Sequence, residues 1–270
     1  MAVFRRGPSK QVALLERDLL TNRVALGQWL KGLINVRRVD LSPDGRHLIY
    51  FASNYRPGSD VGGTWTAVSR LPDLRALHLY GWGHSWNGGG LFIDNTTYWL
   101  NEGGRARQGS IGLIACRLRA SDAPPDGVTP AMGQDPMTYI PRLMRDGWKQ
   151  VGHGPDGPRV IAATFEKRIR AGWVLEKRFR MGVHAGPLDE MYHDVHRLIG
   201  FEGPVEFAAE RAEVWKHELR LATAGCLWRQ RVHAKGLEDA VQVADLNDTW
   251  FKAIEARYAS VGRADLRASV

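Results

Sequence analysis

The stretch VDLSPDGRHLIYF, residues 39–51, decides the predicted fold. In this stretch, two apolar segments flank a short polar turn. Pro43 presets the backbone angle φ for the first turn position, Asp44 suits the second, and Gly45 accepts the left-handed conformation that reverses the chain. The stretch therefore predicts a β-hairpin.

Short apolar segments separated by Gly, Pro, Asn and Asp continue this pattern along the chain, which predicts an all-β protein. Further strands are expected at residues 64–68, 74–80, 90–93, 97–100, 111–118, 148–151, 159–165, 212–215, 219–222 and 226–229. Together with the hairpin, the first two of these strands would form a four-stranded antiparallel meander.

Two segments near the ends of the chain predict helices. In the N-terminal segment, residues 1–31, apolar side chains with imperfect helical spacing run over residues 11–29. Residues 249–261 show a similar spacing after polar residues that can cap a helix. Between the predicted strands, a Pro-rich loop is expected at residues 121–137.

The Ser-Pro-Asp-Gly turn between the strands of residues 39–51 resembles the WD40-like repeat of TolB-type β-propellers, and residues 154–165 resemble it without the Ser. The rest of the chain is similar to bacterial proteins of that general kind. The resemblance implies a single propeller domain over residues 1–270, with about five degenerate four-stranded blades of roughly 50–60 residues each. Stacking around an axis would cover the apolar faces and edges that a lone meander exposes. The resemblance implies an architecture and no activity.

The composition is that of a globular protein, with 44% hydrophobic and 24% charged residues. Lys and Arg number 37 and Asp and Glu 29, so the formal net charge is +8. No apolar stretch approaches the roughly 18 residues of a membrane helix, and no apolar region follows the basic N-terminus as it would in a secretory signal. Cys116 and Cys226 lie in apolar runs, where buried free thiols are common, so we expect a reducing, cytoplasmic location.

A segment rich in Gly and Trp, residues 81–90, is expected to form a loop between two strands. Its candidate binding residues are Trp82, His84, Trp86 and Asn87, because so many neighbouring glycines leave little to cover the two tryptophans. The tryptophans inside predicted strands are expected in the core instead: Trp65 and Trp99.

The sequence GHSWNGG, residues 83–89, resembles the nucleophile elbow of α/β-hydrolases, with Ser85 as the nucleophile. Asn87 stands where the elbow has Gly. The residues that follow predict a turn and a strand, whereas an elbow continues into the helix that helps to build the oxyanion hole. A loop between strands is therefore the favoured interpretation.

Two other segments hold residues that suit chemistry or recognition. His193 and His196 have the spacing of two metal ligands on one helix face, with carboxylates nearby, but a polar loop with surface histidines is the favoured interpretation. Residues 165–180 carry six basic and two acidic side chains interleaved with aromatic ones. Such a segment could contact nucleic acid, but the alternation is also typical of a solvated hairpin.

The function predicted from these observations is a non-enzymatic scaffold or binding module for another protein, with no catalytic residue, metal or cofactor. A hydrolase centred on Ser85, or a metal site at His193 and His196, is the alternative from a different class. Nucleic-acid binding through residues 165–180 is the second alternative, and nucleic acid is the less favoured partner. No membrane partner and no oligomeric state are assigned.

Overall fold

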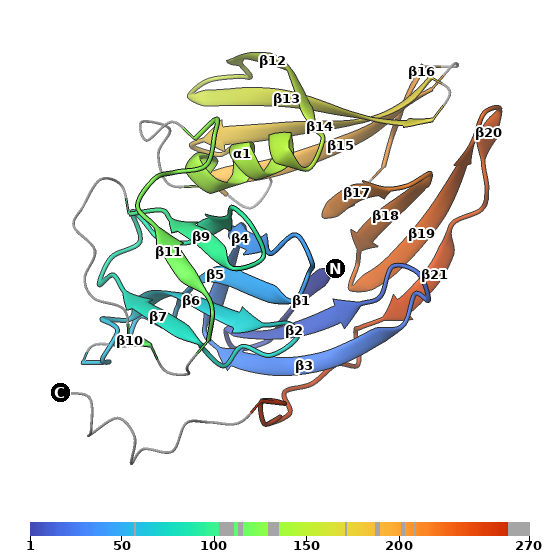
Figure 1. Ribbon diagram of the computed structural model, residues 1–270. Coiled ribbons are helices and arrows are strands. Elements are labelled where there is room, and N and C mark those ends of the chain that lie inside the picture. The colour runs from blue at the N-terminus through green and yellow to red at the C-terminus, as the bar shows by residue number, and fades with distance from the viewer. Residues whose placement is uncertain are drawn as a thin grey trace. The chain divides into compact units, whose positions relative to one another are not determined.

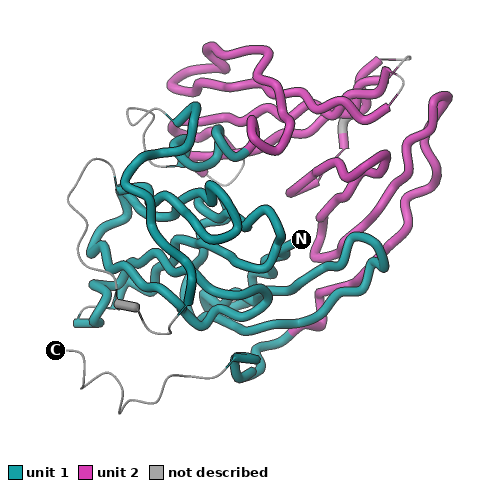
Figure 2. The backbone as a smooth tube through the Cα atoms, viewed as in Figure 1, with its two compact units in different colours: residues 1–142, 250–270 teal, residues 143–249 magenta. Residues whose placement is uncertain are grey.

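The computed structural model of the chain describes residues 1–56, 58–102, 111–112, 116–128, 135–170, 172–186, 190–200, 203–207 and 209–258. Within them, strands hold 54% of the residues and helix 4%, which confirms the all-β prediction (Figure 1). The chain forms two compact units, residues 1–142 with 250–270 and residues 143–249 (Figure 2). A single propeller domain over residues 1–270 stays a prediction.

Three sheets make up the described part of the first unit. The first is an antiparallel meander of β1 (Ala2–Gly7), β2 (Gln11–Arg17) and β3 (Val24–Lys31). The second has the order β10-β7-β6-β5-β4, with β4 (Leu33–Leu41), β5 (His47–Ser53), β6 (Thr64–Arg70), β7 (His78–Gly81) and β10 (Ile111–Gly112). The third has the order β11-β9-β8, with β8 (Gly90–Phe92), β9 (Thr97–Leu100) and a parallel β11 (Arg119–Ser121).

Two antiparallel sheets make up the described part of the second unit, after a helix, α1 (Pro136–Arg145), that spans the boundary between the units. One sheet has the order β12-β13-β14-β15-β16, with β12 (Lys149–Pro155), β13 (Val160–Arg170), β14 (Trp173–Gly182), β15 (Tyr192–Gly200) and β16 (Gly203–Glu206). The other sheet contains β17 (Arg211–Trp215), β18 (Glu218–Thr223), β19 (Cys226–His233), β20 (Gly236–Leu237) and β21 (Val241–Asp245). Its order is β17-β18-β19-β20, and β21 also pairs with β19.

The predicted hairpin at residues 39–51 is confirmed as β4 and β5, which pair up to Leu41 opposite Leu48. The Ser42 hydroxyl closes the turn, because it donates to Asp44 Oδ1 at 2.6 Å and accepts from the His47 N–H at 2.9 Å. Gly45 has a φ of 71°, as the turn chemistry requires. The predicted meander is also confirmed, with β10 as an additional fifth strand.

Replacing Gly45 with Val tests this turn. An added Cβ at Gly45 would meet no atom within 4 Å, so the effect comes from the positive φ alone. A β-branched residue is strained there, and we expect Gly45→Val to lower the free energy of unfolding by about 1–3 kcal/mol, measured by urea denaturation. Gly154→Val is the matched control, because Gly154 lies in β12 in equally open space without a positive φ. Equal losses in both variants would contradict the argument.

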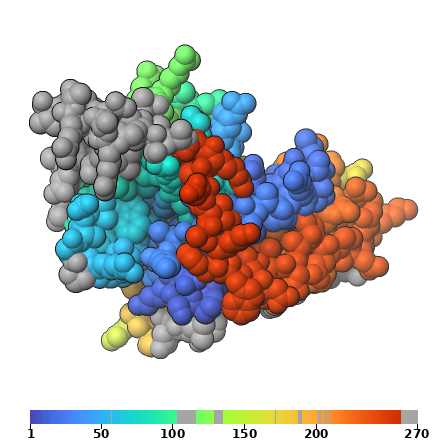
Figure 3. Space-filling model, turned by 90° about the horizontal axis from the view of Figure 1, so that it is seen from below, coloured from blue at the N-terminus to red at the C-terminus, as the bar shows by residue number. Residues whose placement is uncertain are grey.

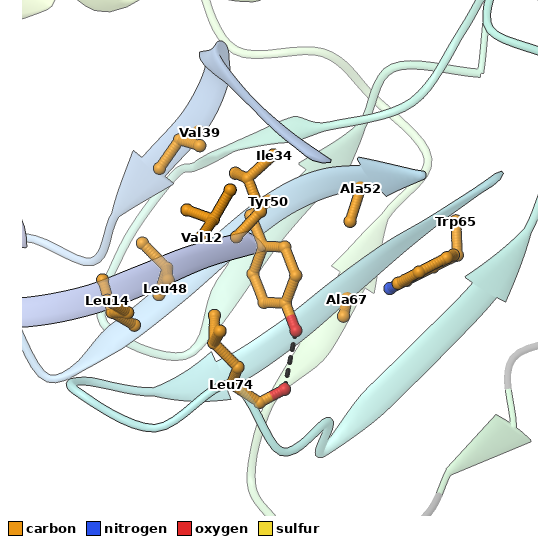
Figure 4. Close-up of a cluster of buried hydrophobic side chains, with 10 residues drawn as sticks. All are labelled: Val12, Leu14, Ile34, Val39, Leu48, Tyr50, Ala52, Trp65, Ala67 and Leu74. Atoms are coloured by element: carbon orange, nitrogen blue, oxygen red, sulfur yellow. Dashed lines mark hydrogen bonds between the residues drawn. The ribbon is translucent and has the colours of Figure 1, made fainter. Parts of the chain in front are cut away.

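The core of the first unit surrounds the hairpin. Val12, Leu14, Ile34 and Leu48 are buried in one cluster, and the hydroxyl of buried Tyr50 donates to the Leu74 carbonyl at 2.6 Å (Figure 4). Burying these apolar side chains stabilises the fold through the hydrophobic effect, while the hydrogen bond satisfies the polar atom that the Tyr50 side chain brings inside. A second cluster contains Ile49, Val68, Tyr80, Phe92 and Tyr98 on the opposite face of the same sheet.

The predicted helix at residues 11–29 is wrong, because these residues form most of β2 and β3. In β2, Val12 to Leu15 are all buried, since β1 and β3 pair with its two edges and both of its faces are covered. Asp18 begins the turn between the two strands, and its carboxylate accepts from the N–H groups of Leu20 and Thr21. The turn chemistry there outweighs the imperfect helical spacing of the leucines.

The predicted helix at residues 249–261 is also wrong over its described part, residues 249–258, which contain no helix. This segment lies along β3 instead, where the Gln28 amide donates to the Ile254 carbonyl at 2.8 Å. The rings of Trp29 and Phe251 are 5.9 Å apart. Figure 3 shows the red C-terminal segment on the surface beside the blue N-terminal strands. Residues 259–261 lie outside the described residues.

Other predicted elements need smaller corrections. The Pro-rich loop at residues 121–137 contains the end of β11 and the first two residues of α1, and residues 129–134 lie outside the described residues. Residues 74–77 precede β7 without being strand, and the strand expected at 111–118 is reduced to β10, with 113–115 outside the described residues. The described sheets have three or five strands, not the four expected of each blade.

Candidate functional site

The Gly- and Trp-rich segment forms the connection between β7 and β8, and its exposed residue is Trp86. This side chain is 70% exposed. Trp82 differs from the prediction, because it is half-buried and its indole N–H donates to the Thr66 hydroxyl at 2.8 Å. His84 and Asn87 are half-buried. The structure therefore places all four predicted residues in one loop, but presents only one of the two tryptophans to solvent.

A buried arginine holds the backbone of this loop. Arg38 donates to the carbonyls of Ser85 and Asn87 at 2.8 and 2.9 Å, and its Nε lies 2.5 Å from Asp135 Oδ1. Its guanidinium lies over the Phe51 ring, 4.9 Å from the centroid. Arg38 sits in an irregular part of β4, between Asn35 and Val39, where the register with β5 shifts. Such a bulge redirects a side chain, here to the loop.

Residues of β6 and the residue Glu102 after β9 make further hydrogen bonds with this loop. Thr64 donates to the His84 carbonyl at 2.8 Å, and the Asn87 amide donates to the Glu102 carbonyl at 2.9 Å. The Gly89 N–H donates to the Thr66 hydroxyl at 2.8 Å. Together, Thr64 and Arg38 engage the carbonyls of His84 and Ser85, which precede Trp86, and of Asn87, which follows it.

Two glycines at the end of the loop are required by the packing. A Cβ at Gly88 would lie 2.2 Å from the Phe51 ring, and one at Gly89 would lie 2.7 Å from the Arg38 backbone carbonyl. Both residues also have a positive φ. The loop thus passes directly over β4 and β5, and only glycine permits so close an approach.

The loop does not have the local structure of a nucleophile elbow. Ser85 is exposed, and residues 83–87 are bends that lead into β8. An elbow requires a helix at that point, because the helix N-terminus supplies part of the oxyanion hole. The prediction that a turn and a strand follow Ser85 is confirmed.

The two histidines proposed as an alternative metal site lie on β15, not on a helix. Because side chains alternate on a strand, His193 and His196 point to opposite faces of the sheet. His193 Nδ1 lies 3.1 Å from Glu190 Oε2, whereas His196 is buried and its ring stacks on Phe207 at 6.4 Å. Among the described residues, no group of three or more His, Cys, Asp or Glu side chains is placed to hold a metal ion.

The basic segment at residues 165–180 is confirmed as a hairpin, made by β13 and β14. Many of its charges have partners within the second unit. Arg178 and Arg180 both bind Asp156, at 2.6 and 2.8 Å, and Lys167 lies 2.7 Å from Glu213 Oε1. This pairing lowers the net positive charge that the hairpin presents to a polyanion.

Lys177 in the same hairpin is buried, and its ammonium lies 4.6 Å from the centroid of the Trp148 ring. The Trp148 indole N–H donates to Glu213 Oε2 at 3.2 Å. Burial raises the pKa of the Glu213 carboxyl, but the charges of Lys177 and Lys167 outweigh this effect and hold the pKa below its ordinary value. These contacts make the inner face of the hairpin part of the packing of the second unit.

Sequence reasoning missed Arg38 as the residue that organises the loop. The available signal was the pair Arg37-Arg38 inside a predicted strand, because alternation places one of two adjacent charged residues on the covered face. Its partner Asp135 lies 97 residues away, and nothing in the sequence pattern links the two. Sequence reasoning also gave no role to His78, which lies beside Cys116.

Comparisons with known proteins add no identification: no family model, no curated protein and no solved structure matches the chain. In the described part of the chain, no helix is both long and apolar enough to cross a membrane.

Proposed function

We propose that the protein is a non-enzymatic binding module that engages another protein through the loop of residues 81–90, with Trp86 as the principal contact. The observation that carries this proposal is a 70% exposed tryptophan whose two flanking residues have their carbonyls held by Arg38. An exposed Trp offers about 150–250 Å² of apolar surface to a partner, and Trp is enriched among the residues that dominate binding energies.

The fixed backbone matters because ordering a flexible loop costs free energy at the moment of binding. Arg38 already holds the carbonyls on either side of Trp86, and Thr64 holds the preceding one. The loop is therefore preorganised, and the partner has to immobilise little more than the Trp86 side chain. A folding role for Trp86 would instead favour a buried ring, as Trp65 and Trp99 have.

The same proposal includes a finer architecture, a β-propeller with degenerate blades. The described residues form five sheets that succeed one another along the chain except at β10, which joins the second sheet after β9, and four of the five contain only antiparallel neighbours. This succession supports the interpretation of the sheets as degenerate propeller blades, and propellers commonly present binding loops at one face. The fold by itself supplies no activity.

Trp86→Ala tests the proposed contact. We expect the variant to retain less than about one tenth of the partner captured by the wild-type protein from lysate of the source cell, since a hot-spot residue contributes about 2 kcal/mol or more. The captured protein is identified by mass spectrometry, and its affinity for purified wild-type protein and variants is then measured by calorimetry. The free energy of unfolding should change by less than about 0.5 kcal/mol, because Trp86 makes few contacts.

Trp250→Ala is the matched control, because Trp250 is 67% exposed and lies outside the loop. It should bind the partner as the wild-type protein does. Equal affinities of the two alanine variants for the partner would contradict the proposal, since the loop would then make no special contribution. A loss of folding in Trp86→Ala would also contradict it by assigning Trp86 to the structure.

A further inference from the structure

Four side chains form a series of hydrogen-bond contacts that begins at Cys116 and ends in the buried interior of the first unit. Cys116 Sγ lies 3.3 Å from His78 Nε2, and His78 Nδ1 lies 2.5 Å from the Tyr98 hydroxyl oxygen. The Tyr98 oxygen is in turn 2.6 Å from that of Tyr80. A nucleophile, a base and a group that orients the base thus stand in sequence, within hydrogen-bond reach of one another.

The proton shared by Cys116 and His78 can reside on the Cys116 sulfur or on His78 Nε2. With a proton on His78 Nδ1 donated to Tyr98, Nε2 presents its lone pair to the thiol. Burial lowers the pKa of His78, so the imidazole is neutral at neutral pH and can act as an acceptor. When Nε2 takes the thiol proton, both N–H groups of the imidazolium have acceptors, namely the Cys116 thiolate and the Tyr98 oxygen.

The tyrosines fix this geometry. Tyr98 is fully buried, and its ring packs against Tyr80, Phe92 and His78 at centroid distances of 6.5, 5.9 and 5.9 Å. Its hydroxyl therefore has little freedom to leave His78, and His78 is held with one ring nitrogen toward the sulfur. Cys116 is itself only partly buried.

We propose that Cys116 is a nucleophilic thiol activated by His78, and that it is a site of covalent modification by small disulfides. The Cys116 proton moves to His78 Nε2, and Sγ attacks one sulfur of the disulfide R–S–S–R. A new S–S bond joins Cys116 to one R–S group while the original S–S bond breaks. The departing thiolate takes the proton from His78 and leaves as R–SH.

The other cysteine offers an internal control. Cys226 is also partly buried. Its sulfur lies 3.8 Å from Asn247 Nδ2, an amide nitrogen that has no lone pair to accept a proton. The comparison of each thiol in the wild-type protein with the same thiol in His78→Gln therefore isolates the contribution of the histidine.

The experiment treats the native protein near pH 7 with hydroxyethyl disulfide, a small neutral disulfide, and follows each cysteine by peptide mass spectrometry. We expect Cys116 to react about tenfold faster or more than Cys226, as expected for a thiol paired with a histidine. In His78→Gln, the Cys116 rate should fall to within about threefold of the Cys226 rate, while the Cys226 rate stays the same. In urea, both thiols of the wild-type chain should react at similar rates.

Equal rates at the two cysteines of the native wild-type protein would overturn the proposal, and so would a rapid Cys116 in His78→Gln. A fast Cys116 that persists in urea would place the cause in the local sequence and would overturn it as well. Tyr98→Phe provides a second variant that keeps the ring. It should slow Cys116 without changing Cys226, because His78 loses the acceptor that orients it. Circular dichroism and the Cys226 rate show whether each variant retains the native fold.

Discussion

Arg38→Met is expected to lower the free energy of unfolding by about 3–5 kcal/mol, the range observed when one partner of a buried ion pair is removed. Met approximates the length of the arginine stem but leaves the Asp135 carboxylate buried without its 2.5 Å ion-pair partner. The carbonyls of Ser85 and Asn87 lose their donor at the same time. Each unsatisfied acceptor adds to the cost to the extent that water does not reach it. Urea denaturation measures the change.

Arg46→Met is the matched control for this experiment. The Arg46 side chain is 81% exposed, and its nitrogen lies 3.7 Å from Asp44. Exposed pairs contribute about 0–1 kcal/mol, so this variant should unfold almost as the wild-type protein does. In the double variant Arg38→Met with Asp135→Asn, part of the loss should be recovered, because no buried carboxylate is left unpaired. A loss below about 1 kcal/mol in Arg38→Met would contradict the assigned role.

Arg38→Met also tests whether the held backbone contributes to the proposed binding site. Without Arg38 the carbonyls beside Trp86 are released, and the loop has to be ordered when the partner binds. Trp86 itself would be intact in Arg38→Met, so any weaker binding by folded protein would come from the lost preorganisation. This outcome differs from that of Trp86→Ala, which removes the contact and leaves the backbone held.

Elements with local signals were the predictable part of this fold. The turn at Gly45 needs a positive φ, and the four residues Ser-Pro-Asp-Gly are sufficient to predict such a turn. The sequence also indicated that Trp65 and Trp99 are core residues, because each lies inside an apolar strand. In these cases the determining interactions involve neighbours in sequence, which a pattern can reveal.

Elements determined by distant contacts were missed. β2 is the middle strand of its sheet, and its apolar residues Val12 to Leu15 form a continuous run, because both faces are covered. Such a run does not distinguish a buried strand from a helix. The half-buried position of Trp82 depends on Thr66, and the fixed backbone of the candidate loop depends on Arg38. Those contacts arise only after the sheets have formed.

His196 provides the clearest expected response to acid. The residue is 1% exposed, so its ring is removed from water. Lys177 lies opposite it on β14, Asp194 precedes it by two positions on the same face of β15, and Arg211 of β17 binds Asp194 at 3.2 Å. Burial is the main cause that lowers the pKa of His196 to about 3, and the charge of Lys177 adds to it, whereas Asp194 opposes the shift.

The sign of the effect follows from the protons that each state binds. In the unfolded chain the histidine has its ordinary pKa of 6.5 and gains a proton as the pH falls below that value, whereas in the folded protein it stays neutral down to a pH of about 3. Because the unfolded state binds more protons over this range, acid favours unfolding. Between pH 7 and pH 5 the difference is worth about 2 kcal/mol of stability.

We therefore expect the wild-type protein to lose about 2 kcal/mol more than His196→Phe when the pH is lowered from 7 to 5, measured by urea denaturation at each pH. Phe keeps an aromatic ring against Phe207 and removes the group that titrates. His193→Phe is the control, because His193 lies on the same strand with its side chain on the opposite face, beside Glu190. That variant should retain the acid sensitivity of the wild-type protein. Parallel pH profiles for the wild-type protein and His196→Phe would show that the buried histidine does not cause the loss.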